Sequence, residues 1–129
     1  MKTGTINTIR ILIADDHAMV RLGLDQILNS VDDFSVIGHA CDGLEAVQLY
    51  ERLQPDVVMM DRAMPNMDGL TATQILRQRN PSVKVIVLSA SEDESVIQES
   101  LLSDVEVMLS KDASINEILD TVYTVSQNC

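Results

Sequence analysis

Polar side chains that could act together follow four of the apolar segments of this chain, at the point where each segment ends. They are Asp15 and Asp16, Asp61, Ser89, and Lys111. Carboxylates that share a small space raise one another's pKa unless a cation lies between them. Mg²⁺ is the natural cation, because it takes oxygen ligands in octahedral geometry. A lysine and a hydroxyl beside it would suit the oxygens of a phosphoryl group, so these residue types indicate a site that places a phosphoryl group on a carboxylate.

None of these residues, taken singly, identifies a functional site. Asp-Asp after a strand is also a common helix N-cap, and Ser89 or Lys111 alone would be an ordinary surface residue. The functional interpretation depends on their joint placement at strand ends.

The segment 55–70 is the one around which the rest of the chain is organised. Its apolar run at 57–60, V-V-M-M, is too short for a helix and fits a strand that is buried on both faces. Asp61 ends this strand, and 64–69 is a turn-rich loop with Pro65 and Gly69 as turn residues. Open parallel α/β sheets bind ligands just beyond the carboxyl ends of their strands, which is where Asp61 would lie.

Four further strands and five helices complete the expected pattern. The strands are Ile9–Ala14, Phe34–Ala40 (a weaker, alternating segment typical of an edge strand), 83–89 and 105–109. The helices begin at Asp16, at Asp42-Gly43, at about Leu70, at a capping box at 91–94, and at a second capping box at 114–117. The last helix has an apolar stripe of Ile115, Ile118, Leu119, Val122 and Val125. Strands that alternate with helices predict a parallel sheet covered on both faces, although spacing does not determine the strand order.

Composition limits the classes of function. The 129 residues are enough for one domain, and 20 acidic against 9 basic residues leave a net charge of −11. Such a surface repels phosphate backbones, so binding to nucleic acid or to an anionic membrane is not expected. No apolar run approaches the roughly 18 residues of a membrane helix. Cys41 and Cys129 have no metal-binding spacing, so we expect a reducing, cytoplasmic location.

The chain resembles the receiver domains of two-component response regulators over essentially its whole length, from Arg10 to about Gln127. The motifs that carry this resemblance are I-L-I-A-D-D-H-A-M-V-R-L-G-L, D-G-L-E-A-V, P-D-V-V-M-M-D-R-A-M-P-N-M-D-G, L-S-A and K-D. The D-D-H opening and the K-D ending are most similar to receivers of NarL/FixJ (LuxR-type) transcriptional regulators. The resemblance implies a doubly wound, flavodoxin-like (βα)5 fold whose five-stranded parallel sheet has the order 2-1-3-4-5.

The resemblance also implies a role for each site residue. Asp61 would be the phosphoacceptor, Asp16 a direct Mg²⁺ ligand, and Asp15 a support through water, with the backbone carbonyl of Ala63 as a further ligand. The Ser89 hydroxyl would bond the phosphoryl group, and Lys111 would pair with it.

Two histidines and one methionine need separate interpretation. Met108 stands where receivers usually carry Tyr or Phe, three residues before the lysine, so the switch formed with Ser89 is expected to be weaker. His17 is interpreted as a first-turn helix residue rather than a ligand, because the receiver pattern requires no histidine there. His39 is expected on the surface.

The expected function is that of a phosphorylation-controlled signalling module and not of an enzyme. A sensor histidine kinase or phosphotransfer protein would phosphorylate Asp61, and the change would reach 91–102, the fifth strand and the last helix. Either that surface or the first and last helices could form a homodimer. A phosphohydrolase of the haloacid dehalogenase type would need a second Asp where Ala63 stands. A flavodoxin-like cofactor binder would need a Gly-rich phosphate loop after the first strand.

The expected organisation is one receiver domain at 1–129, structured over about 9–127, without its DNA-binding output domain. The alternative is a stand-alone receiver that acts by protein contact or as a phosphorelay intermediate.

Overall fold

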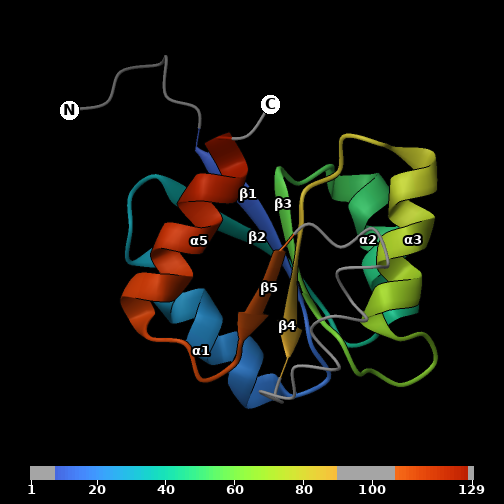
Figure 1. The fold of residues 1–129 in the computed structure, drawn as a ribbon, viewed down its shortest axis with the longest axis horizontal. Helices are drawn as coiled ribbons and strands as arrows, with labels where there is room; N and C mark the ends of the chain where they lie inside the picture. The colour runs from blue at the N-terminus through green and yellow to red at the C-terminus, as the bar shows by residue number, and fades with distance from the viewer. Residues whose placement is uncertain (1–7, 90–106, 128–129) are drawn as a thin grey trace.

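The structure, a computed structural model, describes residues 8–89 and 107–127. At its centre lies a five-stranded sheet in which every neighbouring pair is parallel, in the order β2-β1-β3-β4-β5 (Figure 1). The strands are β1 (Ile9–Ala14), β2 (Phe34–Ala40), β3 (Val57–Asp61), β4 (Val85–Ser89) and β5 (Val107–Ser110). This confirms the receiver-type sheet and the place of β2 at its edge.

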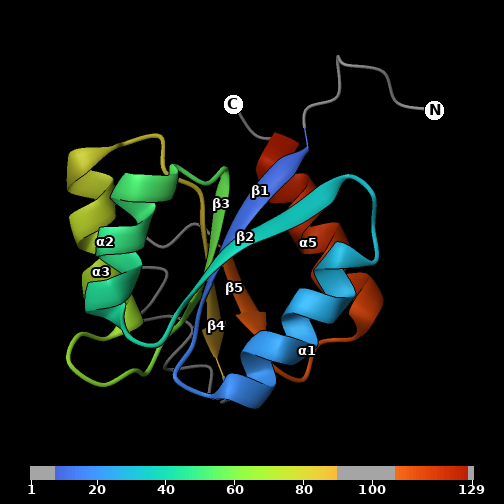
Figure 2. The ribbon, with the colours of Figure 1, turned by 180° about the vertical axis from the view of Figure 1, so that it is seen from behind.

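Four described helices cover the two faces of the sheet. Helices α1 (Ala18–Asn29) and α5 (Ile115–Gln127) cover one face, and α2 (Gly43–Leu53) and α3 (Gly69–Arg79) cover the other (Figures 1 and 2). The helix expected over 91–102, and the first two residues of the strand expected over 105–109, lie outside the described residues. None of the described helices combines the length and the apolar character needed to cross a membrane.

Side-chain alternation in the buried strands produces two separate cores. In β3, Val57 and Met59 belong to the core under α1 and α5, whereas Val58 and Met60 belong to the core under α2 and α3. All four side chains have no exposed surface. The unbroken apolar run that defined this segment in the sequence is therefore the consequence of a strand covered on both faces.

Capping residues fix where two of the helices begin, as the sequence indicates. Asp42 accepts a hydrogen bond from the backbone N of Glu45 at 2.8 Å and caps α2. The Ser114 Oγ accepts one from the backbone N of Glu117 at 3.1 Å and caps α5, which confirms that capping box.

Two expectations about the helices are wrong. Helix α1 begins at Ala18 and has His17, whose backbone is extended, and not Asp16 as its N-cap. Ile115 is 57% exposed, although it was expected in the apolar stripe of α5. It is the first residue of α5 and is not part of the buried core under α1 and α5.

Candidate functional site

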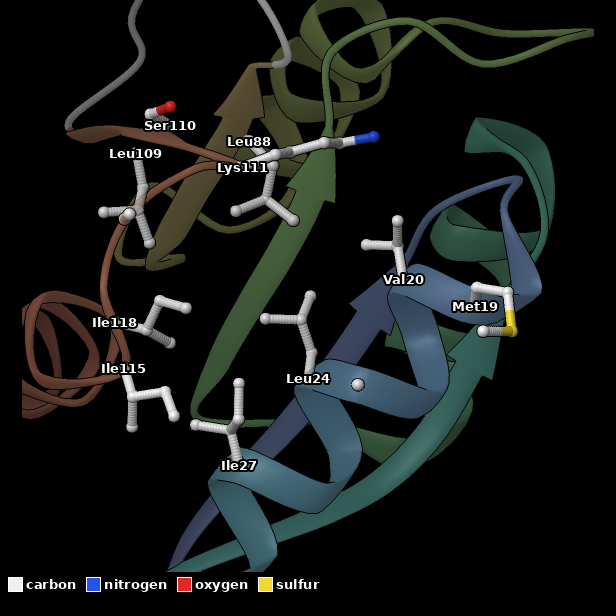
Figure 3. A pocket seen from close by; sticks show the side chains of 12 residues that line it. Met19, Val20, Leu24, Ile27, Leu88, Leu109, Ser110, Lys111, Ile115 and Ile118 are labelled. Carbon is white, nitrogen blue, oxygen red and sulfur yellow. The ribbon is translucent and has the colours of Figure 1, made fainter.

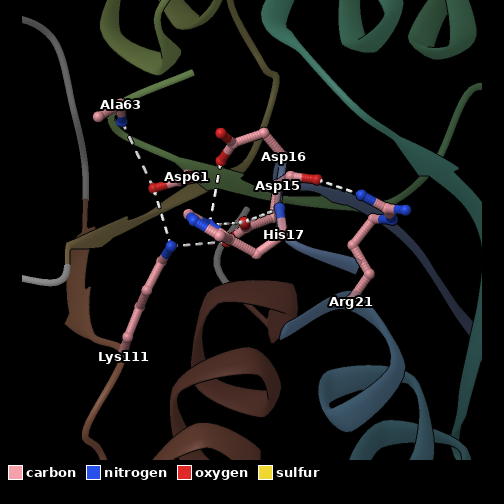
Figure 4. Close-up of polar contacts among 7 residues, drawn as sticks. All are labelled: Asp15, Asp16, His17, Arg21, Asp61, Ala63 and Lys111. Atoms are coloured by element: carbon pink, nitrogen blue, oxygen red, sulfur yellow. Dashed lines mark hydrogen bonds and ion pairs between the residues drawn. The ribbon is translucent and has the colours of Figure 1, made fainter. Parts of the chain in front are cut away.

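The carboxyl ends of β1, β3 and β5 bring the predicted charged residues together (Figure 4). Ala14 pairs with Met60 across β1 and β3, so Asp15 and Asp61 follow at adjacent positions. Lys111 reaches both of them from the residue after β5, with its Nζ 2.8 Å from Asp15 Oδ2 and 3.2 Å from Asp61 Oδ1. Three residues that are far apart in the sequence thus form one ion-pair network.

Asp61 is buried, with an exposed fraction of 3%, and its two oxygens differ. Oδ1 lies near Lys111 and accepts a weak hydrogen bond from the backbone N of Ala63 at 3.4 Å. Oδ2 is buried and accepts no hydrogen bond from the described residues. Burial, and next the negative charge of Asp15, raise the pKa of Asp61 to about 6, against the lowering effect of Lys111.

Lys111 is held in its charged form by the same network. Burial lowers the pKa of Lys111, but its hydrogen bond to Asp15 and the charges of Asp61 and Asp15 outweigh burial and raise that pKa above its ordinary value. A fixed positive charge therefore lies beside the Asp61 carboxylate.

Asp15 and Asp16 occupy different environments. Asp15 is fully buried, its Oδ1 accepts a hydrogen bond from the backbone N of His17 at 2.8 Å, and its carbonyl accepts one from Arg21 Nη1 at 2.7 Å. Asp16 is more exposed. The His17 ring lies against both carboxylates, with Nδ1 3.1 Å from Asp15 Oδ1 and from Asp16 Oδ1. Neither the contact of Arg21 with the Asp15 carbonyl nor the place of the His17 ring can be predicted from the sequence, because helix periodicity does not report which way a side chain near the N-terminus of a helix turns.

The loop after β3 is anchored at both ends by close packing. A Cβ on Gly69 would lie 2.1 Å from the Asp61 carbonyl oxygen, so a side chain is excluded there. The expected role of Gly69 as a turn residue is therefore wrong: it is the first residue of α3, without a positive φ, and it permits close approach. Asn66 takes the positive φ of 69° instead, and its Nδ2 donates to Asp42 Oδ2 at 2.7 Å. This loop carries Ala63, which is exposed.

Ser89 and Met108 lie on neighbouring strands. Ser89 is buried at the end of β4, and its carbonyl accepts a hydrogen bond from the backbone N of Lys111 at 2.9 Å. Met108 pairs with Val87 and packs against the core under α2 and α3. Because side chains alternate, Ser89 and Met108 share a face of the sheet, as a switch pair would require.

An apolar hollow of about 230 Å³ opens beside Lys111 between α1 and the start of α5 (Figure 3). Its lining includes Leu24 and Ile27 from α1 and Leu109 and Ile118 from β5 and α5. Met19, 81% exposed, and Ile115 stand at its edge. An apolar surface is thus continuous with the charged site.

The donor set fits a divalent cation. One ligand atom from each of Asp15, Asp16, His17 and Asp61 can be chosen so that all four lie within 4.8 Å of one another. The buried Asp61 Oδ2 lacks a hydrogen-bond donor among the described residues, as expected for an atom that binds a metal. Carboxylate oxygens are the ligands that Mg²⁺ prefers.

Comparison with known proteins agrees with this arrangement. The chain is 40% identical to the transcriptional regulatory protein DegU of Brevibacillus brevis over 121 residues, which are 94% of this chain and 51% of DegU. The chain spans about half the length of the curated relatives it matches.

Solved structures show the same fold. The signal receiver domain of NarL from Mycobacterium tuberculosis superposes with a TM-score of 0.90 at 28% identity, covering 95% of this chain and 99% of that one. CheY in the CheX–CheY–BeF₃–Mg²⁺ complex of Borrelia burgdorferi gives a TM-score of 0.85 at 30% identity, covering 93% and 90%. The family model for the response regulator receiver domain matches residues 11–123. The chain belongs to the response regulator receiver domain family.

Proposed function

We propose that Asp61 is the phosphoacceptor of this receiver and that a sensor histidine kinase or a phosphotransfer protein is the donor. The observation that carries the proposal is the asymmetry of the Asp61 carboxylate. Its Oδ1 is oriented by Lys111 and by the backbone N of Ala63, whereas its buried Oδ2 has no hydrogen bond from the described residues. The carboxylate is thus fixed in orientation beside a positive charge, and its Oδ2 is left for the cation that would assist attack by the carboxylate.

In the transfer, an oxygen of Asp61 forms a bond to the phosphorus of a phosphohistidine, and the phosphorus–nitrogen bond breaks. The electron pair of that bond goes to the donor imidazole. Lys111, held charged between Asp15 and Asp61, would balance the charge on the phosphoryl oxygens, and Ser89, buried at the end of β4, would bond one of them after transfer. Ala63 stands two residues after Asp61, where a phosphohydrolase would carry its acid/base, so we propose a phosphoacceptor rather than an enzyme that turns over.

The acidic residues would hold Mg²⁺, which would neutralise charge on the transferring group when bound. Receiver domains bind Mg²⁺ at an acidic pocket, and the related CheY was solved in a complex with BeF₃ and Mg²⁺. In this chain Asp16, Asp61 and the Ala63 carbonyl would be direct ligands. Asp15 would act through water, because its Oδ2 already lies 2.8 Å from Lys111 Nζ.

The donor protein would dock over the apolar hollow between α1 and α5. A phosphohistidine must reach Asp61, and the hollow is the apolar surface that adjoins Lys111. The exposed Met19 and Ile115 at its edge offer contact area to an amphipathic helix of the donor.

Phosphorylation of this receiver would control transcription. The relative DegU is described as a transcriptional regulatory protein, and it is about twice as long as the matched region. An acidic receiver would act through a separate DNA-binding domain and not by contacting DNA itself. The open reading frame tests this part: a stop codon directly after Cys129 would favour the stand-alone alternative.

Phosphorylation by acetyl phosphate with Mg²⁺ tests the acceptor. Intact mass should show one added phosphoryl group on the wild type and none on Asp61→Asn. Asp16→Asn should weaken Mg²⁺ binding more than Asp15→Asn. Label that survives in Asp61→Asn, or a wild type that is never modified, would refute the assignment.

A second experiment separates docking from chemistry. Met19→Glu should slow transfer from a phosphorylated kinase by about tenfold and leave labelling by acetyl phosphate unchanged, because the small donor needs no protein surface. Leu44→Glu, at a 48% exposed position on α2, is the matched control and should change neither rate. Equal slowing by both variants would contradict docking at the hollow.

A further inference from the structure

His17 lies in the acidic site for a reason other than helix capping. It is the N-cap residue of α1, with extended backbone angles (φ −100°, ψ 112°), but its side chain makes no capping hydrogen bond. The backbone carbonyl of His17 accepts hydrogen bonds from the backbone N of Val20 and of Arg21, both at 3.1 Å. The imidazole instead turns toward Asp15 and Asp16, as Figure 4 shows, and its Nδ1 lies within hydrogen-bond distance of Asp15 Oδ1, at 3.1 Å.

The spacing of His17 Nδ1 and the Asp16 oxygen matches that of adjacent ligands on one ion, with the Asp15 carboxylate beside them. Ligands at about 2.1 Å from a common ion lie roughly 3.0 Å apart when adjacent and roughly 4.2 Å apart when opposite. His17 Nδ1 lies 3.1 Å from an oxygen of Asp15 and from one of Asp16. One candidate ligand atom from each of Asp15, Asp16, His17 and Asp61 can be chosen so that all four lie within 4.8 Å of one another, somewhat wider than the spacing of opposite ligands on a bound ion. The buried Asp61 Oδ2, without a hydrogen bond from the described residues, is an independent indication that the site takes a cation.

We propose that His17 Nδ1 is a ligand for divalent transition metals such as Co²⁺, and that it shifts the selectivity of this site away from Mg²⁺. An imidazole nitrogen adds affinity for transition metals, whereas Mg²⁺ prefers oxygen and gains little from it. The inference rests on the metal site of the proposed function and adds to it a nitrogen ligand on the exposed side of Asp15 and Asp16.

Metal titrations on matched histidine variants test this assignment. His17→Ala removes the ring without removing a cap, because the ring makes none. His17→Phe keeps a ring of similar size and removes only the nitrogen. His39→Ala is the control: His39 is the other histidine of the chain, and its Nε2 lies 2.7 Å from Asp25 Oδ2 between β2 and α1, outside the site. Co²⁺ binding is followed by visible absorbance and calorimetry, and Mg²⁺ binding by calorimetry alone.

We expect both His17 variants to bind Co²⁺ at least about tenfold more weakly than the wild type and to lose intensity in the Co²⁺ absorbance bands. Their Mg²⁺ affinity should stay within about twofold, and His39→Ala should match the wild type with both metals. Wild-type binding of Mg²⁺ with a Co²⁺ affinity that does not depend on His17 would overturn this inference and leave the proposed function standing. A wild type that binds neither metal would overturn both. An equal loss of Mg²⁺ and Co²⁺ affinity would overturn the selectivity and show that His17 only shapes the site.

Discussion

On one face of the sheet, α2 and α3 pack directly against each other, whereas on the other face an apolar hollow lies between α1 and α5. The α2–α3 side is joined by polar contacts as well: Asn80 Nδ2 donates to the Tyr50 hydroxyl at 2.8 Å, and the backbone N of Gly43 donates to the Met67 carbonyl at 3.1 Å. The α1–α5 side instead exposes Met19 and Ile115.

The charged residues of the site belong to only one of these two faces. Asp15, Asp61 and Lys111 continue the alternation of the side chains that pack under α1 and α5. The face covered by α2 and α3, the closely packed face, thus holds the loop after β3 in place. The face covered by α1 and α5, the open face, carries the charges and the surface that a partner can contact. A rigid support on one side allows reactive groups to be held on the other at a cost in stability.

Gly69→Ala should be the largest disruption of the closely packed face. The new Cβ would meet the Asp61 carbonyl oxygen at 2.1 Å, so the loop or α3 must move. We expect the free energy of unfolding, measured with urea, to fall by about 3 kcal/mol or more. Gly23→Ala on α1 is the control, because its Cβ meets nothing within 4 Å, and it should gain about 0.5–1 kcal/mol. Similar losses in both variants would remove the distinction between the two faces.

Asp61→Asn tests whether the negative charge of Asp61, on the open face, lowers the free energy of unfolding. The pKa of Asp61 in the folded protein, about 6, lies above its ordinary value of 3.8. The neutral Asp61 carboxyl therefore adds to the free energy of unfolding fully below about pH 4, and this stabilisation is lost as the pH rises through 6. In EDTA, the variant should match the wild type near pH 4 and exceed its free energy of unfolding by about 1–3 kcal/mol above pH 7. A difference that does not change with pH would contradict this.

Asp42→Asn should have the opposite dependence on pH, on the closely packed face. Its hydrogen bond from the backbone N of Glu45, and then the one from Asn66, lower the pKa of Asp42. The stabilisation is therefore present above the ordinary pKa and is lost as the pH falls through the folded value. The asparagine keeps an oxygen that can cap α2, so we expect a loss of about 0.5 kcal/mol at pH 7 that is smaller at pH 3. Urea unfolding at the two pH values measures it.

Met108→Tyr should give the smallest effect. It should change how strongly phosphorylation of Asp61, on the open face, alters the arrangement around Ser89 and Met108 on the closely packed face. Methionine adapts to either arrangement around Ser89, so phosphorylation biases two states less than it would with a stiff aromatic ring. The variant should strengthen dimerisation induced by beryllofluoride and Mg²⁺, measured by sedimentation. A wild type that already dimerises fully, or a variant that behaves identically, would place the switch elsewhere.

Local physics determined much of this protein from its sequence alone. The bounds of β1, β2 and β3, and the start of α2, follow from apolar runs, from alternation, and from the cap at Asp42. The site residues at the strand ends were predicted because parallel strands place their carboxyl ends at one edge. The strand order came from the family resemblance and not from spacing, because no local signal encodes which strands pair.

Only the tertiary structure decided the close contacts. Gly69 is a glycine because the chain returns to within contact of Asp61, and no turn conformation requires it. His17 lies among the carboxylates because it is an extended residue directly before α1 and its ring turns toward Asp15 and Asp16. Both facts depend on how the ends of separate elements meet, and neither helical periodicity nor strand alternation contains that information.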